Sequence, residues 1–540
     1  MRAIVRAAEA LYGLLLMAGL VAPLVIFFYR VAPWHSDVGA FFAQKSVHSA
    51  VLNSLALALA TALIATTLGF AFSWLLWRFD WPRGPARALA LMLKIPYLLP
   101  PFFFAIGWIA LAAPQVGYLN RALAFMHLPM LPLLYGLPGT IFVEVLWTTA
   151  LAMIQLQGFF QQFPGHLEDA AVLCGASPAR TFFSITVPLA KPQLISCALL
   201  TSVSALSAFG VPAMLASPAH QFVLTTLIYQ GIKSYQDFSQ AALLSLVLLT
   251  ITFLVLLSQR FCGRAKPFLL VGGKAGRPAQ LQPRAGAKFL FAVAALVAVL
   301  GSGLPCLAIL ARSLLRDPSD LTSWNVEKYV SVFTGTTGGF LALLNSISAS
   351  GLAALVATLF GVVVAYGASK LGRRPSRILI EAWNIGYALP GTVIALALLV
   401  FFAGSITDTL WILSLAYLVK YAAFALRTLT PAIGAIGKEL EEAAWMSGAS
   451  PVKTFFKILL PLLQPALAAA VLLALVPMLS ELTMSVLLVG AGTETLGSVI
   501  FKMQEYADPG SAAVLAVTAM AAILALNAIL KRVSKGNFGI

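Results

Sequence analysis

Charge is the property that this sequence lacks most. Only 10% of its 540 residues are Asp, Glu, Lys or Arg, whereas soluble globular proteins carry roughly 25%. Hydrophobic residues make up 60% of the chain. A chain of this composition cannot cover a water-exposed surface with charge, so lipid must be its main solvent. This excludes an ordinary soluble domain.

Other absences narrow the function further. The sequence has four cysteines without a close CxxC pair, so we expect small apolar packing residues, no disulfide and no metal cluster. It also has no GxxxxGK[ST] phosphate loop, so we do not expect this chain to hydrolyse ATP. The net charge is +16, but the basic residues lie in short clusters between apolar runs. No basic soluble domain is present to bind nucleic acid.

Apolar runs long enough to cross a bilayer, which takes about 20 helical residues, recur along the whole chain. The first half contains six, at 10–30, 51–77, 88–112, 133–156, 193–216 and 238–259. The second half contains six more, at 287–311, 343–369, 378–403, 409–429, 466–490 and 511–530. The sequence therefore predicts an all-α polytopic membrane protein with about twelve transmembrane helices.

Basic residues between the runs predict the orientation of the chain, because Lys and Arg are retained on the cytoplasmic side. They gather after the second run of each half and in the stretch 260–286, which has no acidic residue. This pattern places both termini in the cytoplasm. The Gly and Pro residues of 260–286 predict a cytoplasmic linker between two halves, 1–259 and 287–540.

The two halves contain an internal repeat, which is clearest at about 160–192 and 433–465. Glu168-Asp169-Ala170-Ala171 is followed by Gly175-Ala176-Ser177-Pro178 in the first half. Glu441-Glu442-Ala443-Ala444 is followed by Gly448-Ala449-Ser450-Pro451 in the second, and one constant spacing relates the two copies throughout. So many identities in one register indicate a duplication. Because each half has an even number of apolar runs, we expect parallel repeats.

The residue order of this loop predicts two short helices joined by a sharp turn. An acidic residue in the first turn is favoured by the helix dipole. The glycine is suited to ending the first helix, and Ser-Pro is suited to starting the second. Paired alanines leave a smooth helix face. Such a projection fits the groove of a partner protein.

The loop resembles the cytoplasmic loop of bacterial binding-protein-dependent ABC importer permeases, where E-A-A-x-x-x-G is followed, after nine residues, by I-x-L-P. The second copy fits closely, with Glu442-Ala443-Ala444, Gly448 and Leu460-Pro461. The first copy departs at Asp169, in place of glutamate, and at Val187, in place of leucine. Glu168 is the alternative acidic residue there.

This resemblance implies a type I importer permease fold, with two parallel six-helix repeats on one chain in the inner membrane. Each loop would form a coupling helix on one of two copies of a cytoplasmic ATPase, which would bind ATP and Mg²⁺, while a periplasmic binding protein would deliver the substrate. This chain would bind no cofactor itself. The implied coupling residues are Glu168, Asp169, Ala170, Ala171 and Gly175 in the first loop, and Glu441, Glu442, Ala443, Ala444 and Gly448 in the second.

Ionisable residues inside apolar runs are candidates for the substrate pathway, because burying them in lipid is costly. Glu144, Lys420 and Glu481 qualify. They either pair with one another to hold the bundle together or line the pathway. Glu481 is the favoured pathway residue, because Ser480 and Thr483 lie beside it. Arg427 lies near the cytoplasmic end of its run and is expected to extend toward the interface.

The substrate follows only from resemblance. The segment from Glu481 to Leu488, with Ile500 beyond it, looks most like the ferric-iron permease group. Thiamine, phosphonate and polyamine importers are alternatives. A secondary transporter with twelve helices is the main rival class, but it has no need for two matched loops. An intramembrane enzyme is less favoured, because no catalytic residue pattern stands at convincing helical spacing.

Overall fold

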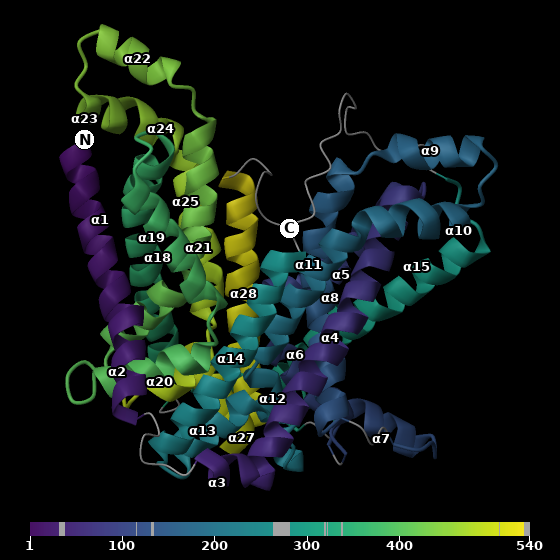
Figure 1. Ribbon diagram of the computed structural model, residues 1–540. Helices are drawn as coiled ribbons and strands as arrows, with labels where there is room; N and C mark the ends of the chain where they lie inside the picture. The colour runs from purple at the N-terminus through teal and green to yellow at the C-terminus, as the bar shows by residue number, and fades with distance from the viewer. Residues whose placement is uncertain are drawn as a thin grey trace.

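The computed structural model describes residues 1–540 except 32–37, 115, 131–133, 263–280, 318–319, 321, 336–337, 507 and 534–540. Among the described residues the chain is helical and contains no β-strand (Figure 1). Most of the predicted linker at 260–286 lies outside the described residues.

The first half contains fourteen α-helices within the described residues. They are α1 (Arg2–Leu16), α2 (Ala22–Val31), α3 (Val38–Ala43), α4 (Lys45–Arg78), α5 (Arg83–Leu98), α6 (Pro101–Ala112), α7 (Tyr118–Phe125), α8 (Leu137–Gln162), α9 (Gly165–Leu173), α10 (Pro178–Thr181), α11 (Val187–Leu206), α12 (Gly210–Leu215), α13 (Leu224–Lys233) and α14 (Phe238–Cys262). A π-helical turn joins α1 to α2 at Met17–Val21, and another joins α10 to α11 at Phe182–Thr186.

The described part of the second half has the same plan. Its helices are α15 (Ala285–Ala298), α16 (Leu304–Leu314), α17 (Glu327–Thr334), α18 (Gly339–Ser369), α19 (Arg374–Ala388), α20 (Gly391–Phe401), α21 (Leu410–Ala435), α22 (Glu439–Met446), α23 (Pro451–Thr454), α24 (Leu460–Leu462), α25 (Gln464–Leu479), α26 (Ser485–Leu488), α27 (Leu496–Tyr506) and α28 (Pro509–Val533). The π-helical turns recur at Val299–Gly303 and Phe455–Leu459.

Nine helical segments of the described chain are long and apolar enough to cross a membrane, and three bent helix pairs raise that number to as many as twelve. The all-helical, two-repeat architecture predicted from the sequence is therefore confirmed. The predicted runs at 88–112 and 378–403 are not straight spans, however. They are the pairs α5–α6 and α19–α20, bent by 106° and 105°.

Proline explains where these two spans break. Pro100 and Pro390 lie between the two helices of each pair and serve as the N-caps of α6 and α20. A proline has no N–H to donate, and it disfavours the α conformation in the residue before it. Leu99 and Leu389, which precede these prolines, are accordingly extended. Each bend exposes backbone groups at mid-span that need partners from elsewhere.

The two halves exchange their first helices. The α1–α2 span packs against α18, α19 and α20 of the second half, whereas α15 and α16 pack against α5 and α6 of the first. A polar clamp holds α1 in place. The carboxylate of Glu9, which is 8% exposed, accepts hydrogen bonds from Arg373 at 2.8 and 2.5 Å and from Ser376 at 2.5 Å.

Both predicted loops lie at one end of the molecule. Figure 1 shows α9 and α22 projecting from the same end, on opposite sides, while α7, α13 and α27 lie at the other end. The bundle between them is a continuous apolar core of buried residues drawn from both halves.

Candidate functional site: two matched loops and the polar residues of the bundle

Each loop is built as two short helices around a left-handed glycine. Gly175 follows α9 with φ of +83°, and Gly448 follows α22 with φ of +78°. A side chain at such a position costs roughly 1–2 kcal/mol. The next helix then starts from a serine whose hydroxyl accepts a backbone hydrogen bond at 3.3 Å, Ser177 in the first loop and Ser450 in the second.

The first acidic residue of each loop points inward and is buried. In the first half, Glu168 is 1% exposed, and its Oε2 lies 2.8 Å from Nε of Arg78 at the end of α4. The hydroxyl of Thr186 donates a hydrogen bond to the other carboxylate oxygen. Burial raises the pKa of the Glu168 carboxyl, and the Thr186 hydrogen bond and the Arg78 charge oppose that rise. The pair fastens α9 to the membrane bundle.

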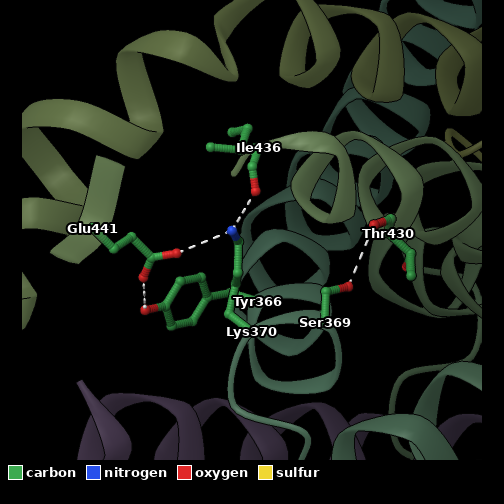
Figure 2. Close-up of polar contacts among 6 residues, drawn as sticks. All are labelled: Tyr366, Ser369, Lys370, Thr430, Ile436 and Glu441. Carbon is green, nitrogen blue, oxygen red and sulfur yellow. Dashed lines mark hydrogen bonds and ion pairs between the residues drawn. The ribbon is translucent and has the colours of Figure 1, made fainter. Parts of the chain in front are cut away.

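The second half repeats this anchor with different side chains (Figure 2). Glu441, 4% exposed, lies 3.1 Å from Nζ of Lys370, which follows the end of α18. The hydroxyl of Tyr366 donates to the other carboxylate oxygen at 2.8 Å. Lys370 also donates to the carbonyl of Ile436 at 2.5 Å, just before α22. One ammonium therefore holds both the acidic residue and the chain that leads into α22.

The second acidic residue of each loop lies nearer the surface. Asp169 is half-buried, with its carboxylate 3.6 Å from Nη1 of Arg78, and Glu442 is exposed. The alanines divide in the same way: Ala170 and Ala443 are exposed, whereas Ala171 is half-buried and Ala444 is buried. The acidic pair thus has an inner, anchoring member and an outer member.

Large apolar side chains are exposed at the tip of each loop. Leu173 and Met446, which occupy the same position in the two copies of the repeat, are each 89% exposed. Val172 and Trp445 beside them are 38% and 45% exposed. Exposed apolar side chains therefore recur at the same two positions of the repeat.

Sequence reasoning missed the basic partners of the loops. Arg78 and Lys370 belong to the basic residues after the second run of each half, from which only the orientation of the chain is predicted. The spacing between them equals the spacing between the repeated pairs Asn53-Ser54 and Asn345-Ser346. Both copies of the repeat keep a basic residue at this position and an acidic residue in the loop. That joint retention is the sequence signal that the two residues form a pair.

Among the predicted pathway residues, Glu481 lies at a helix start. Its carboxylate accepts hydrogen bonds from the backbone N–H groups of Met484, at 2.9 Å, and Ser485, at 3.0 Å. It is 6% exposed. Glu481 therefore caps α26, where the chain restarts a helix after the end of α25. Ser480 beside it is buried, and Thr483 is half-buried.

Lys420 on α21 serves backbone carbonyls, whereas Glu481 serves backbone N–H groups. Its Nζ donates to the carbonyls of Tyr387, at 3.0 Å, and of Leu389, both at the end of α19. Lys420 and Glu481 interact electrostatically, but the described residues show no ion pair between them. The structure thus places Lys420 and Glu481 near each other, and each forms hydrogen bonds with backbone groups where a helix is interrupted.

Glu144 on α8 has no charged partner within the described residues. It is 1% exposed, and its Oε1 lacks a hydrogen bond there. By the spacing of the two loops, its counterpart in the second half is Tyr417, whose hydroxyl lies 2.7 Å from the hydroxyl of Ser485. Arg427 is exposed, as expected, and donates to the side chain of Asn384 at 2.8 Å.

Comparison with known proteins adds independent information. The family described as "Binding-protein-dependent transport system inner membrane component" matches this chain twice, at 69–265 and 357–536. The ferric transport system permease protein FbpB of Actinobacillus pleuropneumoniae is 25% identical over 90% of this chain and 72% of its own length. The Fe(3+)-transport system permease protein FbpB 2 of Haemophilus influenzae is 26% identical over 83% of each chain.

A solved structure also matches in part. It is a chain of a bacterial alginate ABC transporter crystallised with a periplasmic protein that holds an alginate pentasaccharide. That chain is 16% identical over 45% of this chain and 87% of its own length, with a TM-score of 0.41.

Proposed function

Since this chain belongs to the family of binding-protein-dependent transport system inner membrane components and carries the family's domain twice, we propose that it couples import to two separate cytoplasmic ATPase subunits. It is a multi-pass inner membrane permease. In the proposal, α9 docks on one ATPase and α22 on the other, and a periplasmic binding protein delivers the substrate at the opposite end. Both termini then lie in the cytoplasm.

The duplicated, anchored loop supports this proposal best. Each copy exposes a large apolar tip, at Leu173 and Met446, on a helix tied to the bundle by a buried ion pair. An exposed apolar tip provides contact area for a groove. A buried ion pair behind it resists deformation, because separating its charges in a low dielectric is costly. The loop is therefore suited to transmit force from a partner into α4 or α18.

We further propose that the substrate is ferric iron, carried as cargo. The permeases named for ferric transport are similar over most of this chain. The Glu481–Leu488 segment supports the same assignment, and thiamine, phosphonate or polyamine cargo is the alternative. In this chain Glu481 and Lys420, with Ser480 and Thr483, are the proposed pathway residues of the second half, and Glu144 is that of the first.

Co-purification tests the coupling proposal. The chain is co-expressed with its cognate ATPase, and Leu173→Asp and Met446→Asp are made singly and together. Each single variant should lower ATPase recovery, and the double variant should abolish it, because a carboxylate at the tip cannot enter an apolar groove. Phe125→Asp is the matched control, since Phe125 is 88% exposed on α7 at the other end. Full ATPase recovery with the double variant would contradict the proposal.

Transport tests the cargo. Proteoliposomes that contain the chain and its ATPase are supplied with the binding protein loaded with ferric iron, and iron uptake is measured with and without ATP. Uptake should require ATP and the binding protein. Uptake driven by an ion gradient alone would instead identify a secondary transporter. ATPase stimulation by a binding protein loaded with thiamine or a phosphonate, but not with iron, would replace the cargo assignment.

A further inference from the structure

The first helix of each half packs against the other half, and the side chains at these two equivalent contacts differ. The π-helical turns Met17–Val21 and Val299–Gly303 fix the correspondence between the two first helices. Pro23 and Pro305 stand at the same spacing as these turns. By that spacing, the counterpart of Glu9 is Phe291.

A second correspondence covers the loop that these helices contact. Pro85 and Pro375 stand at the same spacing as the proline residues Pro100 and Pro390 at the bends. By this spacing Arg83 corresponds to Arg373, and Ala86 corresponds to Ser376. The first half therefore keeps the arginine of the clamp but lacks both the carboxylate and the hydroxyl that complete the clamp in the second half.

The first half has an open cavity at the corresponding place. A hollow of about 700 Å³ lies between the α4–α5 connection and the start of α15, with Arg83 and Lys288 in its wall. Neither cation forms an ion pair among the described residues. Asp80 is the only acidic residue that lines the hollow in the described chain. On its apolar side Phe291 packs on Trp81, with ring centroids 4.4 Å apart.

The cavity lies where three spans end, on the side that carries α9. The α4 span ends at Arg78, the bent α5–α6 span starts at Arg83, and the α15–α16 span starts at Ala285. Apolar spans end near the lipid headgroups. Tryptophan is enriched at that depth, and basic pockets at cytoplasmic helix ends bind anionic headgroups.

We propose that this cavity binds the phosphate headgroup of an anionic membrane phospholipid, which supplies the first half with the negative charge that Glu9 supplies to the second. Arg83 and Lys288 bind the phosphate. Trp81 and Phe291 contact the glycerol and upper acyl region. The binding is reversible and involves no chemistry. The proposal does not depend on the cargo or on the ATPase.

The bound lipid would lie beside the first coupling loop. The backbone of Leu281 pairs with Arg78 and Asp80, donating at 3.1 Å and accepting at 3.0 Å. The side chain of Leu281 lies in a small hollow together with Glu168 and Val172. One chain segment thus connects the wall of the lipid cavity to the anchor of α9.

Native mass spectrometry of the full chain tests this proposal. The protein is titrated with phosphatidylglycerol or phosphatidylcholine, and retained lipid is counted. The wild type should retain one phosphatidylglycerol more tightly than phosphatidylcholine. The double variant Arg83→Gln/Lys288→Gln should weaken that binding roughly 10-fold or more, because each basic residue near an anionic headgroup contributes on the order of 1 kcal/mol.

A second variant tests whether lipid is lost merely because the protein unfolds. Phe291→Glu installs the carboxylate of the second half and should displace the lipid by pairing with Arg83, while thermal unfolding stays near that of the wild type. Arg374→Gln removes an exposed charge from the equivalent loop of the second half and should retain the lipid.

Two results would overturn the proposal. One is equal phosphatidylglycerol retention by the wild type, the double variant and Phe291→Glu. The other is binding of inorganic phosphate that displaces phosphatidylglycerol from the wild type, which would make the occupant a soluble anion rather than a lipid.

Discussion

The two matched loops hold the same geometry with different cations. Arg78 reaches both acidic residues of the first loop, Glu168 at 2.8 Å and Asp169 at 3.6 Å. Lys370 reaches one acidic residue, Glu441, and also donates to a backbone carbonyl. A planar guanidinium suits two carboxylates, whereas an ammonium suits scattered oxygens. The duplicated fold therefore fixes where a positive charge is needed but not which side chain supplies it.

In the bent spans, too, different side chains fill the same role in the two halves. Trp147 on α8 and Lys420 on α21 occupy the same position in the two copies of the repeat, and each donates to the carbonyl at its bend. The indole of Trp147 binds the carbonyl of Leu99 at 2.9 Å, and Lys420 binds that of Leu389. A neutral donor suffices in the first half. The second half uses a charge, and it also has an acidic cap nearby, Glu481.

Breaking an anchor should have the largest effect. Arg78→Met leaves Glu168 buried without a cation, and Lys370→Met leaves Glu441 in the same position. Removal of one partner from a buried pair costs about 3–5 kcal/mol. Both variants should lower the thermal unfolding temperature and ATPase recovery. Arg78→Lys and Lys370→Arg are the controls, and they should retain most of both. Wild-type stability in the methionine variants would show that these pairs hold nothing together.

Removing the donor at a bend sharpens the second comparison. Lys420→Met leaves two carbonyls at the end of α19 without a donor, whereas Trp147→Phe frees one carbonyl at the end of α5. Each unsatisfied buried group costs about 1–3 kcal/mol. The unfolding temperature should therefore fall more for Lys420→Met than for Trp147→Phe. The opposite order would show that Lys420 contributes less than Trp147 to holding the broken backbone.

The glycine turns should give the smallest effect, and an equal one. Gly175→Ala and Gly448→Ala each place a Cβ at positive φ with no atom within 4 Å. The cost is then backbone strain alone, roughly 1 kcal/mol in each loop. ATPase recovery should fall slightly and by the same factor for both variants. Unequal losses would show that the partner contacts one turn and not the other.

The sequence predicted the repeat, most of the spans and the two projecting loops, because each rests on local pattern. The predicted runs 193–216 and 466–490 are not continuous helices, since α11 ends at Leu206 and α25 ends at Leu479. Prolines at Pro100 and Pro390 also mark the bends in the sequence. The bend angles of 106° and 105° do not follow from proline, since they depend on which helices pack against α6 and α20.

The site was less predictable, because its contacts join distant segments. An acidic residue inside an apolar run predicts a pathway role for Glu481, which stays a proposal, but it does not predict the backbone contacts of its carboxylate. The end of α25 at Leu479, which gives Glu481 backbone N–H groups to accept from, has no proline or glycine immediately after it to mark it. Glu9 lies just before the first predicted run, 10–30, and nothing in the sequence marks it as half of a clamp. Its partner Arg373 lies in a loop that only the exchange of first helices brings near.

That exchange also sets the order in which the protein can be assembled. Glu9 and Arg373 are separated by 364 residues, which a ribosome adding about 5–20 residues per second needs roughly 20 to 70 s to make. Until then Glu9 lacks Arg373, and α18, α19 and α20 are not all available for α1 and α2 to pack against. The α1 span is thus made long before the helices that it finally packs against.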